Sequence, residues 1–147
     1  MTKQLVKTAV FGLFLSLFVT SCSVLPGGDE EIKSNEELIV GLWRVNSFKL
    51  NGEEFIGEEG LIRSLTIDFG PIVGSRGTRV FRVIGSTGEE SSDFGQYSIN
   101  EINGELTFTG DGQPETYELS FQGDNELTMN SAAGGFITTF KAERLSN

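Results

Sequence analysis

The residues of this chain that could do chemistry are one cysteine and many carboxylates. The 147-residue sequence contains one Cys, Cys22, and no His, the commonest general base and metal ligand. Adjacent acids occur at Glu53-Glu54, Glu58-Glu59 and Glu89-Glu90, in predicted loops where carboxylates are usually solvated. None of them fits the spacing of a calcium-binding loop. We therefore expect no enzyme activity, no metal site and no cofactor.

Glycines and arginines offer a second possible chemistry, the binding of an anion. The segment 70–77 is rich in glycine but lacks the Lys-Ser/Thr ending of a phosphate-binding loop, so we interpret it as a loop at the mouth of the fold. Arg76, Arg79 and Arg82 form one cationic cluster, in which Arg79 and Arg82 are expected to face opposite ways. An inward arginine would pair with a ligand carboxylate or phosphate, or else be solvated or satisfied by neighbouring acids. The formal net charge of −10 argues against nucleic acid as a partner.

The first 22 residues have the three parts of a secretory signal peptide. A basic start is followed by an apolar segment, residues 8–19, and then by small residues directly before Cys22. The apolar segment is too short to span a bilayer stably. It is also apolar on all sides, which does not suit a buried helix of a small domain. We therefore predict a signal peptide at residues 1–21.

Val19-Thr20-Ser21-Cys22 resembles the lipobox of bacterial lipoproteins, which has an aliphatic residue three before the cysteine and small residues between. This resemblance implies that the Cys22 thiol receives a diacylglycerol, that the chain is cut before Cys22, and that the new amine is acylated, for example with palmitate. Several acyl chains, each contributing about 0.8 kcal/mol per buried methylene, make such anchoring effectively permanent.

Residues 22–33 are expected to be a lipidated flexible tether, because they contain a Pro-Gly-Gly break and no periodicity. Loss of Lys3 and Lys7 with the signal peptide takes the formal net charge from −10 to −12. Ser23, rather than an aspartate, follows the cysteine, and this resembles the sorting preference of outer-membrane lipoproteins. We expect a location in the bacterial cell envelope, lipid-anchored at the outer membrane, with either the periplasmic face or the surface possible.

Residues 34–147 have the length of one domain and alternate apolar and polar side chains with a period of two. Short turns rich in Gly, Asn and Asp separate the alternating runs, so sequence neighbours should pair antiparallel. We predict an all-β, eight-stranded antiparallel up-and-down barrel, with a two-sheet β-sandwich as the alternative. The predicted strands are 42–50, 61–69, 78–84, 93–100, 105–109, 115–121, 125–130 and 136–145. Ser34 and Glu37 predict a capping box and a short helix before the first of them.

Gly41-Leu42-Trp43 resembles the Gly-x-Trp motif that opens the first strand of lipocalins. Bacterial lipoproteins with a lipocalin-like domain are the nearest match, and their second motif, Gly-x-Tyr-x-Ile, corresponds here to residues 95–99. Glycine lets the helical turn approach the strand closely, and the Trp43 indole should plug one end with its N–H at a wet rim. In lipocalins an arginine from the last strand lies across this indole, which implies that role for Arg144.

Two functions fit this sequence. In the first, the barrel binds a small apolar or amphipathic molecule, and the lining residues are Tyr97, Phe108, Tyr117 and Phe121, with the loops 51–60 and 70–77 as a movable rim. In the second, these aromatics fill a solid core, and the protein is a structural or assembly lipoprotein that binds an envelope protein partner. An internal cavity above about 300 Å³ would favour the first.

Overall fold

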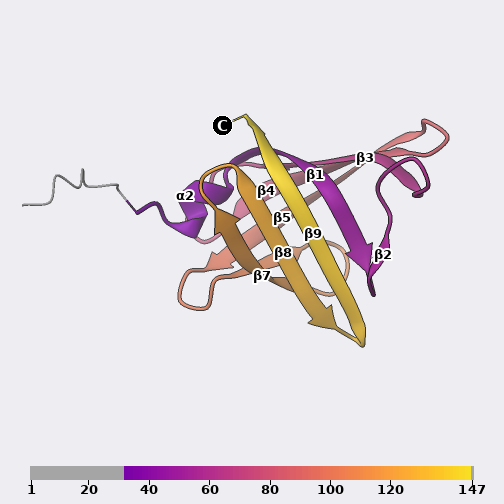
Figure 1. The fold of residues 1–147 in the computed structure, drawn as a ribbon. Helices are drawn as coiled ribbons and strands as arrows, with labels where there is room; N and C mark the ends of the chain where they lie inside the picture. The colour runs from indigo at the N-terminus through magenta and orange to yellow at the C-terminus, as the bar shows by residue number, and fades with distance from the viewer. Residues whose placement is uncertain (1–31, 147) are drawn as a thin grey trace, which may run out of the picture. The chain divides into compact units, whose positions relative to one another are not determined.

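The computed structural model describes residues 32–146, so the predicted signal peptide, Cys22 and most of the predicted tether lie outside the described residues. The described part begins with one short helix and continues as a series of antiparallel strands (Figure 1). The elements are α2 (Asn35–Ile39), β1 (Gly41–Leu50), β2 (Glu53–Glu54), β3 (Ile62–Phe69), β4 (Gly77–Gly85), β5 (Glu90–Asn100), β6 (Glu105–Thr109), β7 (Glu115–Gln122), β8 (Glu126–Ala133) and β9 (Phe136–Ser146).

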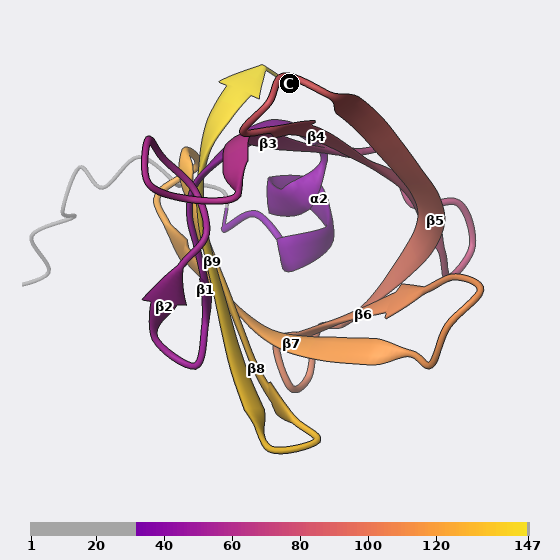
Figure 2. The same cartoon turned by 90° about the vertical axis from the view of Figure 1, so that its right-hand side faces the viewer.

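The strands form one sheet that closes on itself. Their order is β2-β1-β3-β4-β5-β6-β7-β8-β9, and β1 also pairs with β9, so eight strands make a barrel and β2 is an addition to it (Figure 2). The predicted barrel is therefore confirmed, and the alternative of a two-sheet sandwich is wrong, because a single hydrogen-bonded ladder runs around the described domain. Closure pairs the outer strands β1 and β9 with each other and so removes most of the free edge of the sheet. Every predicted strand end lies within three residues of the observed one.

The strand that the sequence analysis missed is β2, which lies in the predicted loop 51–60. It has only two residues, and it pairs with the end of β1 through Lys49↔Glu54 and Leu50↔Glu53. The turn between the strands has Asn51 at φ 51° and Gly52 at φ 86°. Two residues are too few for an alternation pattern, so periodicity could not have identified this strand.

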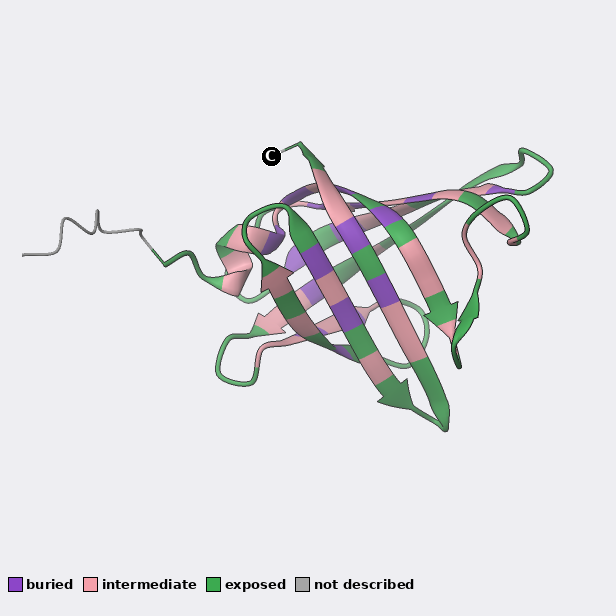
Figure 3. Ribbon diagram, viewed as in Figure 1, coloured by how far each residue is buried: buried purple, intermediate pink, exposed green. Residues whose placement is uncertain are grey.

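Alternate residues of each strand face the interior and form the core. Figure 3 shows the buried positions alternating with exposed ones along the strands. The strand β1 departs from strict alternation, because its pairing with β9 shifts between Val45 and Ser47. This bulge turns Phe48 inward, where it stacks on Phe140 with 4.6 Å between ring centroids. The buried core residues are Ile39, Trp43, Val45, Leu65, Ile67, Phe69, Tyr97, Leu106, Phe108, Tyr117, Leu127, Met129, Phe140 and Ala142.

One end of the barrel is closed by α2, which lies within the ring of strands in Figure 2. The predicted capping box is present: the Ser34 side chain accepts a hydrogen bond from the Glu37 backbone N–H, and the Glu37 carboxylate accepts one from the Ser34 N–H. The carboxylate of Glu101, in the β5–β6 turn, accepts from the backbone N–H of Asn35 and of Glu36. Helix N-terminal donors that have no intrahelical partner are thus satisfied by a turn at the same end.

The opposite end is open, and the barrel wall is incomplete there. Residues 90–95 of β5 pair with β4, whereas β6 joins β5 only from Gln96 onward, through Gln96↔Thr109. The first half of β5 therefore has no second neighbouring strand in the described chain, and the β6–β7 loop, residues 110–114, follows β6 at this level. A pocket opens at this place.

Candidate functional site

At the closed end, the indole of Trp43 is fully buried and its Nε1–H donates to the carbonyl oxygen of Ile39 at 2.7 Å. The sequence analysis expected this N–H at a wet rim. It is buried instead, because the last turn of α2 presents a carbonyl that has no intrahelical partner. Gly41, between the helix and the Trp, has φ 129°, a value that side chains rarely tolerate.

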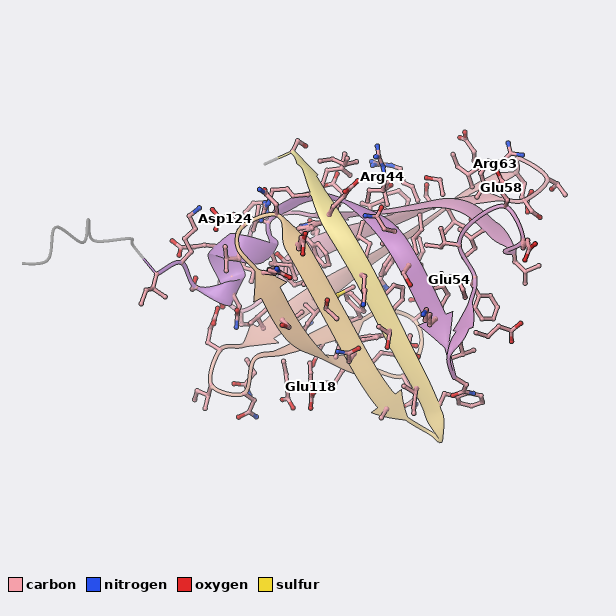
Figure 4. All side chains as sticks on the ribbon, viewed as in Figure 1. Arg44, Glu54, Glu58, Arg63, Glu118 and Asp124 are labelled. Atoms are coloured by element: carbon pink, nitrogen blue, oxygen red, sulfur yellow. The ribbon has the colours of Figure 1, made fainter. Side chains whose placement is uncertain are left out.

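The guanidinium of Arg144 lies across the Trp43 ring, with Cζ 4.4 Å from the ring centroid. The contact implied by the resemblance to lipocalins is therefore present. Arg144 also donates to three backbone carbonyls: from Nε to Asp124 at 2.6 Å, from Nη1 to Val40 at 2.6 Å, and from Nη2 to Leu38. Burial lowers the pKa of this guanidinium, and the negative charge of Asp124 acts in the opposite direction. Arg144 thus joins α2, β9 and the β7–β8 turn, near which Figure 4 labels Asp124.

Two of the four predicted lining residues, Tyr97 and Phe121, also belong to the closed end. The Tyr97 hydroxyl donates to the carbonyl of Gly70 at 2.6 Å, and its ring lies against Gly77, where an added Cβ would be 2.3 Å from a ring carbon. Burial, and then the charge of Glu36, raise the pKa of Tyr97 to about 12. Phe121 packs on the Trp43 indole at 6.2 Å between centroids. Both residues are packed side chains away from the pocket.

The bond from Tyr97 to Gly70 also corrects the prediction for segment 70–77. This segment does not border the open mouth, because it connects the end of β3 to the start of β4 at the closed end. Parity along a strand tells which face a residue occupies, but it does not tell which loops gather at which end of a barrel. Of the two predicted rim loops, only 51–60 follows a strand that ends on the open side.

The pocket at the open end has a volume of about 390 Å³. Phe108 and Tyr117, the other two predicted lining residues, contribute to its wall, and their ring centroids are 5.3 Å apart. Phe81 and Phe140 extend this wall, at 5.3 Å from Phe108 and 5.7 Å from Tyr117. The full lining is Arg79, Phe81, Asp93, Phe94, Phe108, Gly110, Asp111, Gly112, Gln113, Glu115, Tyr117 and Phe140.

A buried arginine lies in this pocket wall. The Arg79 side chain is 9% exposed, and its Nη1 is 2.5 Å from a carboxylate oxygen of Asp93, whose side chain is 67% exposed. Its Cζ lies 4.5 Å from the Phe81 ring centroid and 5.0 Å from that of Phe108. Gly95 leaves room for it, since a Cβ there would be 2.9 Å from Cζ. The Nε–H has no hydrogen-bond partner within the described residues.

The sequence analysis expected Arg79 and Arg82 to face opposite ways, and this is confirmed. Arg82 has a half-exposed side chain, and its Nη1 lies 3.9 Å from a carboxylate oxygen of Asp68. Within the described residues, the inward arginine pairs with a neighbouring acid. The acid, Asp93, was not identified from sequence, although it has the same parity in β5 as Gly95 and Tyr97.

Acids also border the pocket on β7 and the β6–β7 loop. The Tyr117 hydroxyl donates to the carboxylate of Glu115 at 2.8 Å. Burial, this hydrogen bond and the charge of Glu115 raise the pKa of Tyr117 well above its usual value. With Asp111 and Asp93, three carboxylates and one guanidinium belong to the lining. Neither Glu115 nor Asp111 was predicted, because each sits at or beyond a strand end, where alternation carries no signal.

Within residues 32–146, no group of three or more Cys, Asp or Glu side chains is placed to hold a metal ion. No helix in the same part of the chain is long and apolar enough to cross a membrane.

No protein-family model matches the sequence, and no curated protein matches it. Several solved structures do match the fold. A redesigned β-barrel has a TM-score of 0.54 at 14% identity, over 77% of this chain and 96% of its own. A de novo designed fluorescence-activating β-barrel has a TM-score of 0.54 at 14% sequence identity, and the match covers 77% of this chain and 99% of the designed one. The redesigned barrel mFAP1, bound to DFHBI, has a TM-score of 0.51 at 17% sequence identity, and the match covers 76% of this chain and 100% of mFAP1. These likenesses establish the barrel fold of the domain.

Proposed function

We propose that this protein is a lipid-anchored lipoprotein of the bacterial cell envelope whose lipocalin-like barrel binds a small apolar or amphipathic molecule and catalyses no reaction. One observation carries the proposal: the open end of the barrel holds a pocket of about 390 Å³ with an aromatic wall. This volume exceeds the roughly 300 Å³ at which small-molecule sites begin. The pocket is partly open to solvent, and its lining combines five aromatic side chains with charged residues.

The fold and the position of the pocket support the proposal. The designed barrel mFAP1 is bound to a small ligand, DFHBI, so a barrel of this fold can hold one. In the present chain, Lys33 pairs with Asp124 at the closed end, so the segment that we propose as tether joins the barrel opposite the mouth. A ligand would thus enter from the side away from the anchor attachment.

A second candidate function, binding of an envelope protein partner, is favoured by apolar side chains at the tip of the β8–β9 hairpin. Phe136 is 55% exposed and Ile137 is 60% exposed, next to Gly134 and Gly135. Exposed aromatic and aliphatic side chains that lie together often mark protein contacts. We rank this candidate lower because it does not account for the pocket.

Native mass spectrometry of the full lipoprotein, purified from its own host, tests the binding function. We expect a co-purified small molecule, and we expect the variant Phe140→Leu to lose it, because Phe140 lines the pocket. Phe121→Leu is the matched control, since Phe121 packs at the closed end on Trp43. A protein without any small molecule, and with a stoichiometric protein partner that Phe136→Ser removes, would favour the second candidate instead.

The anchor has its own test. Replacing Cys22 with Ser should abolish acylation and move the protein from the membrane fraction to the soluble fraction of the host. The mass of the mature chain should match cleavage before Cys22 plus the acyl groups. An unlipidated chain of full length in the membrane fraction would contradict the proposed anchor without affecting the pocket.

A further inference from the structure

The charges of the mouth pocket indicate which amphipathic molecules it would accept. Arg79 and Asp93 form a close ion pair, so together they contribute no net charge. Glu115 accepts a hydrogen bond from the neutral phenol of Tyr117, and neither Glu115 nor Asp111 forms an ion pair within the described residues. Two negative charges at the rim therefore remain without a cation.

We propose that the mouth pocket selects a positively charged amphipathic molecule, such as an organic amine or quaternary ammonium compound with an aromatic or aliphatic body. The inference rests on the binding function proposed above and specifies its ligand class. The body of the ligand packs against Phe108 and Phe140, and its charge lies at the rim beside Glu115 and Asp111.

Aromatic walls strengthen this preference. The faces of Phe and Tyr rings carry partial negative charge and attract cations that come within about 6 Å of the ring centroid. The same wall already holds one cation in this way, since the guanidinium of Arg79 lies over Phe81 and Phe108. Tyr117 and Phe140, on the other side of Phe108, have no such cation within the described residues. Both line the pocket, although they are only 5% and 8% exposed.

An anionic ligand is disfavoured by the same geometry. It would have to compete with Asp93 for Arg79 while lying near Asp111 and Glu115. The chain as a whole has a formal net charge of −10, and a negative protein repels anions and concentrates cations at its clefts. Arg79 therefore does not make this pocket an anion site.

A second observation, independent of the acids, also indicates that this pocket holds a molecule. The Nε–H of the nine-tenths-buried Arg79 lacks a hydrogen-bond partner in the described chain. Buried donors without partners are rare in folded proteins and mark places where a ligand or water belongs.

Three naphthyl compounds with the same ring and different heads test the charge preference: 2-naphthylmethylamine, 2-naphthylmethanol and 2-naphthoate. Each is titrated by calorimetry into the full lipoprotein in zwitterionic nanodiscs at pH 7, with empty nanodiscs subtracted. We expect the amine to bind roughly tenfold tighter than the carboxylate, with the alcohol between them, as two nearby carboxylates in a partly solvated mouth would produce. Raising the salt concentration should narrow this difference.

Two matched variants locate the charge. Glu115→Gln keeps an acceptor for the Tyr117 hydroxyl and should weaken amine binding about fivefold while leaving the alcohol unchanged. Glu118→Gln removes the same charge from the outer face of β7, where Figure 4 labels Glu118, and should change amine binding less than twofold.

The possible outcomes separate the two proposals. Tightest binding of the carboxylate, or equal binding of all three compounds, would overturn the charge selection and leave the binding function standing. Equal effects of Glu115→Gln and Glu118→Gln would also overturn it, because the preference would then come from net charge alone. Failure of all three compounds to bind the folded protein would contradict the binding function itself, and the selection with it.

Discussion

The two ends of this barrel each hold an arginine against aromatic rings, but the two arginines have different partners. At the closed end, Arg144 lies over Trp43 and donates to the carbonyls of Leu38, Val40 and Asp124. At the open end, Arg79 lies over two Phe rings, contacts one mostly exposed carboxylate, and has an Nε–H with no partner among residues 32–146.

This difference distinguishes an arginine that stabilises the fold from an arginine that lines a binding pocket. Arg144 uses its donors to join three segments that are distant in sequence, so its removal takes the donor away from three backbone carbonyls. Arg79 joins one strand to its neighbour, and part of its hydrogen-bonding capacity is unused next to a pocket. Unsatisfied buried polar groups are rare in folded proteins, so the one at Arg79 requires an explanation that Arg144 does not.

The largest effect is expected from Trp43→Ala at the closed end. Removing a fully buried indole that also makes a hydrogen bond should lower the free energy of unfolding by about 3–5 kcal/mol. Urea denaturation followed by far-ultraviolet circular dichroism measures this, since the variant lacks the only Trp of the chain. A loss below 1 kcal/mol would mean that the closed end is not part of the cooperative core.

The next largest effect distinguishes the two arginines directly. Arg144→Met should lower the free energy of unfolding by about 2–4 kcal/mol, because charge-assisted hydrogen bonds to three carbonyls and a cation–π contact are lost. Arg79→Met should change it by less than about 1 kcal/mol, since a methionine can fill the space of the arginine stem and the Asp93 carboxylate left behind is mostly exposed to solvent. Equal losses in the two variants, measured by the same denaturation, would contradict the comparison.

Tyr97→Phe tests the closed end through the pH dependence of the free energy of unfolding. At neutral pH the variant should lose about 1–2 kcal/mol, because the carbonyl of Gly70 loses its donor. The folded protein raises the pKa of Tyr97 from 10 to about 12, so it holds the phenolic proton more tightly than the unfolded chain does. The contribution of Tyr97 to stability is therefore fully present below pH 10 and is lost as the pH rises from 10 to 12.

Denaturation midpoints measured from pH 9 to pH 12 check this predicted loss of stability at alkaline pH. The wild-type curve should fall more steeply above pH 10 than that of Tyr97→Phe. Tyr117→Phe should remove another part of the slope, because the pKa of Tyr117 is also raised. Identical alkaline curves for the wild type and both variants would show that these phenols ionise in the folded state as freely as in water.

The smallest effect concerns Glu54 of β2, which Figure 4 labels beside β1. Burial raises the pKa of Glu54, but hydrogen bonds from the Ser47 hydroxyl and from the backbone N–H of Phe48 and of Ile56 outweigh it, and the net pKa is below 4.5. The stabilisation is thus complete above pH 4.5 and is lost as the pH falls below it. Because the group is exposed to solvent, we expect Glu54→Gln to cost no more than about 0.5 kcal/mol at pH 7.

Glu53→Gln is the matched control for this variant, since Glu53 is the other residue of β2 and lacks these three hydrogen bonds. It should leave the acid side of the stability curve unchanged. A shift of equal size in both variants would assign the effect to general charge rather than to the hydrogen bonds of Glu54.

Most of the fold was predictable because the period-two pattern is strong and the turns are short. The contact between Trp43 and Arg144 was predictable too, since a family resemblance supplied the partner. The pocket was only half predictable: Phe108 and Tyr117 line it, whereas Tyr97 and Phe121 have the same inward orientation but lie at the closed end. Parity specifies the face of a strand, but the depth of a residue along the barrel depends on the stagger between strands.

By itself the sequence determined that the domain is a meander of eight amphipathic strands, that it contains no histidine chemistry, and that a lipobox-like motif precedes it. Only the tertiary structure decided that β1 closes onto β9, that α2 occupies one end, and that Arg79, Asp93 and Glu115 meet at the other. The physical reason is the distance along the sequence over which each interaction acts. Alternation and turn chemistry act over a few residues, whereas closure and stagger are set by pairing between strands up to about a hundred residues apart.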